Sequence, residues 1–187
     1  MVNQGEVDWS ERENTALPEP LGITILIWLH LIKGMVFAVA LIMPWFKETD
    51  VTGNVEKAGL SPTLVVLGVL LVSILCLGSG LGMMLHKTWG WYLAVYYYIH
   101  SIFRNGYTFY IVSQLADPTE LGDRGPEYYY IKYGAIVVVH FLIFLYLFKS
   151  NVLHFFGLGT VSKAKVLGGL VLIYLGQLAA TSMLSHL

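Results

Sequence analysis

Five apolar runs of 19 to 25 residues dominate this 187-residue sequence. They cover residues 21–45, 63–85, 91–115, 129–148 and 166–184. A membrane-spanning helix needs about 20 mostly apolar residues to cross the hydrocarbon core of a bilayer. Charged residues make up 12% of the chain, which is about half the share of a soluble domain. We therefore expect an integral membrane protein.

The apolar runs are also long enough to decide the secondary structure. A segment in lipid must satisfy its own backbone hydrogen bonds, and these runs are too continuously apolar for barrel strands. We predict an all-α polytopic bundle of five transmembrane helices over residues 21–187, after an acidic, polar N-terminal tail at 1–20. In the alternative arrangement, four helices span and the run at 166–184 lies on the membrane surface.

The distribution of basic residues near the ends of the runs indicates an orientation. With a cytoplasmic N-terminus, five basic residues lie inside, namely Arg12, Lys87, Lys149, Lys163 and Lys165. Four lie outside, namely Lys47, Lys57, Arg124 and Lys132. Cytoplasmic loops carry an excess of Lys and Arg. We therefore expect a multi-pass protein of a bacterial inner membrane with its N-terminus in the cytoplasm. The net charge of −1 gives no reason to expect nucleic acid as a partner.

Basic side chains inside two of the runs are the unusual feature of this sequence. His30 and Lys33 are three residues apart, and His100 and Arg104 are four apart, so each pair shares one side of its helix. All 12 acidic residues lie outside the predicted spans. A charge at the centre of a bilayer costs several kcal/mol, and Arg cannot escape by losing its proton. Something must therefore compensate Arg104, and the candidates are helix carbonyls, tyrosine hydroxyls, internal water, an anionic ligand or lipid, or an acidic residue of another chain.

These residues define a predicted binding stripe for a ligand or partner. It consists of His30, Lys33, Tyr97, His100, Arg104 and Asn105. Our first hypothesis is a non-catalytic subunit of a larger membrane complex, in which the stripe meets an anionic group of a partner chain, a lipid or a small ligand. The expected partners are membrane lipids, other membrane subunits or further copies of this chain. No arrangement of nucleophile, base and acid is visible, so an enzyme is the less favoured class.

A second hypothesis uses the histidines. His30, His100 and His140 each lie nine residues from the same predicted membrane face, which is about 14 Å deep at the rise of a helix. Two such histidines can ligate a b-type haem, and three can hold zinc or copper. The sequence does not specify the metal. A small transporter for an anion or a proton is the third hypothesis.

Glycines in the apolar runs indicate where helices come close. Gly78, Gly80 and Gly82 cluster in the second run, and Gly169 and Gly176 lie in the last. Small residues let two backbones approach in a membrane. We expect these positions to pack against a neighbouring helix of this chain or of a partner.

Overall fold

The computed structural model describes residues 20–46, 61–114 and 125–184, and these residues form helices without any strand. The helices are α2 (Leu21–Phe46), α4 (Pro62–Met84), α5 (Thr88–Gln114), α6 (Pro126–Leu147), α7 (Ser150–Phe155) and α8 (Lys163–Leu184). The predicted all-α fold class is confirmed, and every predicted boundary of the five long helices lies within three residues of the observed one. The predicted tail at 1–20 lies almost entirely outside the described residues.

Four of the described helices are long and apolar enough to cross a membrane. They are α2, α4, α6 and α8, so the last apolar run has the length and hydropathy of a span. Helix α5 is not among them, although its 27 residues would extend about 40 Å. Tyrosines, Ser101, Arg104 and Asn105 lower its hydropathy. The five predicted spans therefore comprise four helices that qualify by hydropathy and α5, which qualifies by its length alone.

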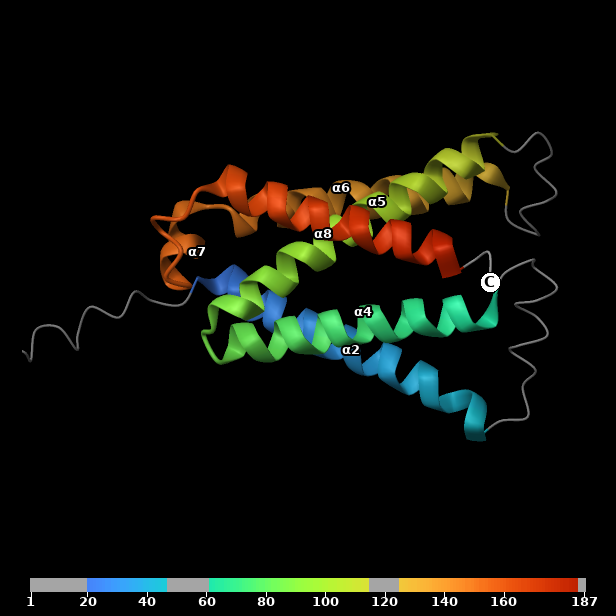
Figure 1. Ribbon diagram of the computed structural model, residues 1–187, viewed down its shortest axis with the longest axis horizontal. Coiled ribbons are helices and arrows are strands. Elements are labelled where there is room, and N and C mark those ends of the chain that lie inside the picture. The colour runs from blue at the N-terminus through green and yellow to red at the C-terminus, as the bar shows by residue number, and fades with distance from the viewer. Residues whose placement is uncertain (1–19, 47–60, 115–124, 185–187) are drawn as a thin grey trace, which may run out of the picture.

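Helix α5 connects the two halves of the bundle. Helices α2 and α4 form one pair, and α5 starts beside this pair and crosses over to run along α6 (Figure 1). Helix α8 lies on the α5 and α6 side (Figure 1). Because α5 packs on α4 and on α6, much of its polar surface faces protein rather than lipid, as a polar stripe requires.

The turn between α4 and α5 holds these two helices very close. Lys87 N donates to the Gly82 carbonyl at 2.8 Å, and His86 has a left-handed φ of 52°. A side-chain Cβ at Gly90 would overlap the backbone of Gly82 and Met83. Only glycine therefore fits at this crossing.

A buried core lies at the same end of the bundle. Trp91 is 1% exposed, and its indole Nε1 donates to the Leu147 carbonyl at 2.9 Å. Val152 and Leu153 of the short helix α7 are also buried. Large apolar side chains elsewhere on α6 and α8 are exposed, including Ile131 and Leu172. Extensive apolar exposure of this kind is typical of a surface covered by lipid.

Candidate functional site

The two faces of α5 carry two separate polar groups of residues. Tyr97, Ser101 and Asn105 are buried and lie toward α2 and α6. His100 and Arg104 instead line a cavity between α4, α5 and α8. The predicted single stripe is therefore divided, and His30 with Lys33 belongs to the first group.

His30 is fully enclosed, and both of its ring nitrogens are in hydrogen bonds. Nδ1 is bonded to Ser79 Oγ, and Nε2 lies 2.9 Å from the Tyr98 hydroxyl. The Ser79 hydroxyl donates its own proton to the Cys76 carbonyl at 3.0 Å, so Nδ1 must be the donor to Ser79. The Tyr98 hydroxyl then donates to Nε2. This assignment describes a neutral imidazole with its proton on Nδ1.

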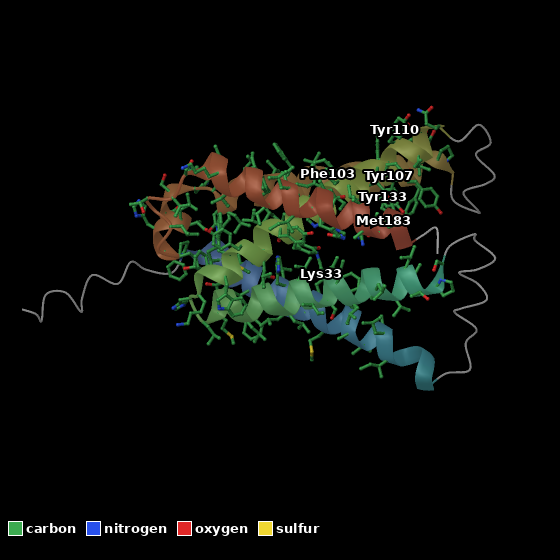
Figure 2. The ribbon with its side chains drawn as sticks, in the orientation of Figure 1. Lys33, Phe103, Tyr107, Tyr110, Tyr133 and Met183 are labelled. Carbon is green, nitrogen blue, oxygen red and sulfur yellow. The ribbon has the colours of Figure 1, made fainter. Side chains whose placement is uncertain are left out.

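Lys33 and His140 complete this first group. Lys33 Nζ donates to the Tyr97 hydroxyl at 2.9 Å, and it lies near the middle of the bundle's length (Figure 2). Asn105 Nδ2 donates to Ser101 Oγ at 3.1 Å. The Ser101 hydroxyl is thus free to donate to His140 Nδ1, 2.9 Å away. Every polar side chain of this group has a partner within the chain.

The second group lies in a cavity of about 590 Å³, a volume typical of small-molecule sites. Its apolar lining comes from α4, with Leu64, Leu67 and Leu71, and Phe103 of α5 contributes a ring. Figure 2 shows Phe103 and Tyr107, which are one turn apart, on the side of the bundle that holds α5 and α8. The polar lining residues are His100, Arg104, Tyr107, Tyr174, Gln177 and Thr181.

The Arg104 guanidinium has no hydrogen bond or ion pair with any other described side chain. Thr108 bonds to the Arg104 backbone carbonyl, not to its side chain. The described part of the chain contains one acidic residue, Glu127, which lies in the first turn of α6. Arg104 is 10 residues from the end of α5 that leads to α6, which is about 15 Å along the axis. Within the described residues, the one carboxylate therefore lies near an end of the bundle, separated from Arg104 along the helix axis.

His100 contributes a buried and unsatisfied nitrogen at this cavity, whereas the Arg104 side chain is exposed. His100 Nδ1 is buried and has no hydrogen-bond partner among the residues that the structure describes. A buried N–H without an acceptor is rarer in proteins than an acceptor without a donor. The ring proton is therefore favoured on Nε2, which makes His100 a hydrogen-bond donor through that nitrogen.

The three histidines predicted at one level occupy two places. The rings of His30 and His140 both contact Tyr97 and Tyr98, whereas the His100 ring contacts Tyr174 of α8. Across residues 20–46, 61–114 and 125–184, no three His, Cys, Asp or Glu side chains are grouped as metal ligands. A haem iron bound by His30 would have to displace Ser79 or Tyr98.

The predicted packing glycines also differ from one another. A Cβ at Gly80 would meet Leu31 of α2 at 2.8 Å, and one at Gly78 would meet Leu93 of α5 at 3.0 Å. Gly82 lies against Gly90 and Trp89. By contrast, Gly169 and Gly176 have no described neighbour within 4 Å of such a Cβ. Close helix packing at Gly169 and Gly176 would therefore need a helix from outside the described residues.

Sequence reasoning did not select Ser79, Tyr174 or Thr181. Hydroxyl side chains are common in membrane helices and carry no periodic signal of their own. Only the rotation of α4 and α8 toward α5 places them in the two polar groups. Comparisons with protein-family models, curated proteins and solved structures found no match.

Proposed function

We propose that this protein is a membrane-embedded binding protein for an anionic amphiphile, held in the cavity between α4, α5 and α8. The observation that supports this proposal is the Arg104 side chain, which lines an otherwise mainly apolar cavity without a described counter-charge. The ligand that matches this lining has one anionic head, either a carboxylate or a phosphate, and a hydrocarbon chain. Our hypothesis of a non-catalytic membrane subunit named a partner chain, a lipid or a small ligand as the source of the anionic group. This proposal chooses a ligand or lipid as that source.

The head of such a ligand has partners on two helices. The Arg104 guanidinium supplies the positive charge and a planar pair of donors that suits a carboxylate or a phosphate. His100 Nε2 adds a donor one turn away on α5, and Thr181 offers a hydroxyl from α8. Leu67 and Leu71 of α4 line the apolar side of the cavity.

The position of Arg104 along its helix argues for a ligand that is itself partly apolar. Arg104 lies 16 residues after the first residue of α5 and 10 before its last, about 24 Å and 15 Å along the axis. An unpaired charge at that depth is strongly unfavourable. A ligand that enters from the bilayer keeps its chain in the hydrocarbon region. It therefore supplies the missing charge without needing a water-filled path through the bundle.

We also propose that the protein lies in a bacterial inner membrane with its N-terminus in the cytoplasm. Lys87, Lys149, Lys163 and Lys165 all lie at the end of the bundle that holds the α4–α5 turn and α7. A Lys87→Cys variant tests this orientation. In right-side-out vesicles it should resist a membrane-impermeant maleimide, and in inverted vesicles it should react. The native Cys76 is fully buried, so it provides little background.

The ligand test uses the full chain in nanodiscs of zwitterionic lipid. Binding of radiolabelled dodecanoate and of dodecyl phosphate is measured for the wild type, Arg104→Leu and Arg104→Lys. We expect Arg104→Leu to weaken binding about tenfold or more, because a hydrogen bond to a charged group contributes about 1.5–3 kcal/mol. Arg104→Lys should keep part of the affinity. The two ligands show whether the head is a carboxylate or a phosphate.

Lys132→Leu is the matched control for this test. It removes one positive charge from an exposed site on α6 that does not line the cavity, so it should leave binding unchanged. Equal dodecanoate and dodecyl phosphate affinities for Arg104→Leu and the wild type would overturn the proposal. A membrane protein that co-purifies with the wild type and is lost with Arg104→Leu would instead assign the anion to a partner subunit.

A further inference from the structure

A second hollow continues from the cavity along the same three helices. It has a volume of about 760 Å³ and a nearly apolar lining. Its walls include Leu75 of α4, Tyr92 and Leu93 of α5, and Leu170 and Ile173 of α8. We call it the lower groove, because it follows α5 from the cavity toward the α4–α5 turn. Lys165 at the start of α8 borders it, so this groove reaches the basic end of the bundle.

Three side chains mark the boundary between the cavity and the lower groove. Leu71 lines both hollows. Tyr96 lines only the lower groove, and Gln177 lines only the cavity. The Tyr96 hydroxyl donates to Gln177 Oε1 at 2.5 Å. This hydrogen bond therefore joins α5 to α8 where the two hollows meet.

We infer that the Tyr96–Gln177 hydrogen bond and Leu71 limit the length of the hydrocarbon chain that the protein accepts. This inference rests on the proposed function. With the anionic head at Arg104, a single chain runs along α5 past His100 and reaches Tyr96 after about two helical turns, or about 12 Å. A chain that ends before this boundary fits the cavity. A longer one must displace Leu71 or break the hydrogen bond to enter the lower groove.

The inference names the ligand class more narrowly than the proposed function does. The protein selects short to medium single-chain amphiphiles with one anionic head, and it disfavours long-chain fatty acids and their phosphate analogues. Packing in an apolar pocket can discriminate by 10-fold to 200-fold for one methylene. The removal of either barrier should therefore move the preference toward longer chains without weakening the head contact at Arg104.

Competition in nanodiscs tests this prediction. Bound radiolabelled dodecanoate is displaced by octanoate, dodecanoate, hexadecanoate and octadecanoate, and by the corresponding alkyl phosphates. The variants are Leu71→Ala, which shortens the shared side chain, and Tyr96→Phe, which keeps the ring but removes the hydroxyl. In both variants, we expect octadecanoate to gain about tenfold relative to octanoate compared with the wild type, because only the octanoate chain is clearly shorter than the distance to the boundary.

Leu75→Ala is the control for the truncation. Leu75 lies one turn from Leu71 on the same helix and lines only the lower groove. The Leu75→Ala variant should therefore show the same chain-length preference as the wild type. If both Leu71→Ala and Tyr96→Phe keep the wild-type profile while binding still depends on Arg104, the boundary is refuted and the proposed function stands. If the wild type binds none of these amphiphiles, both fail.

Discussion

Lys33 and Tyr97 are partners inside the bundle, with the lysine ammonium donating to the tyrosine hydroxyl at 2.9 Å and lying 5.1 Å from the ring centre. They come from α2 and α5, 64 residues apart in the sequence. Of the two cations predicted to lie at hydrocarbon depth, Lys33 therefore has a hydrogen-bond partner within the chain. Arg104 has none among the described side chains, so the two cations differ in their surroundings, and only Arg104 carries the proposed ligand contact.

The Lys33–Tyr97 hydrogen bond should contribute measurably to stability. Tyr97→Phe keeps the ring and removes the acceptor, and Lys33→Met removes the donor. Residues joined by a hydrogen bond show coupling energies of about 0.5–3 kcal/mol. We expect a stabilising coupling in this range from a double-mutant cycle of unfolding free energies in detergent. The pair of exposed Lys132 and half-buried Tyr133 should give a smaller coupling, and equal values would contradict the assignment.

Loss of the Ser79 hydroxyl should destabilise the protein more than loss of the Ser73 hydroxyl on the same helix. Ser79→Ala leaves the His30 Nδ1 proton buried without an acceptor, at a cost of about 1 kcal/mol or more. Ser73→Ala removes only a 3.1 Å bond to the Gly34 carbonyl. Thermal unfolding of the two variants in the same detergent measures the difference. The tautomer assigned to His30 would be wrong if Ser73→Ala were the more damaging change.

The close crossing of α4 and α5 predicts that replacement of Gly90 destabilises the protein. A Cβ at this position overlaps the backbone of Gly82, and overpacking of this kind costs about 1–3 kcal/mol. We expect Gly90→Ala to lower the unfolding free energy by that amount. Gly168→Ala is the control, because open space surrounds this helical glycine and alanine is the better helix former. Equal stability of both variants would argue against the crossing.

An absorption spectrum tests the haem hypothesis. The His30 Nε2 lone pair already accepts the Tyr98 proton, so we expect the purified protein to show no Soret band that depends on His30. Tyr98→Phe would free this nitrogen and serves as the comparison. A Soret band in the wild type that disappears in His30→Ala would support the haem hypothesis. It would also show that His30 Nε2 binds iron and does not accept the Tyr98 proton.

Several features of the site followed from local spacing alone. The i, i+4 separation of His100 and Arg104 placed both on one side of α5, and both line the same cavity. The i, i+3 separation of His30 and Lys33 placed both on the side of α2 that faces α5. Depth was less informative. Residues His30, His100 and His140 share one predicted level, yet His100 faces α8 while the other two face Tyr97 and Tyr98.

Hydropathy and length by themselves determined that this chain forms long membrane helices and where each begins and ends. These properties are local, because a helix in lipid satisfies its own backbone hydrogen bonds. Only the tertiary structure decided which helix each polar face meets. The oblique path of α5 places His30 between Ser79 and Tyr98, and it leaves Arg104 in the cavity beside α8. The rotation of each helix about its own axis follows from packing between residues far apart in the sequence, such as Gly82 against Gly90 and Tyr96 against Gln177.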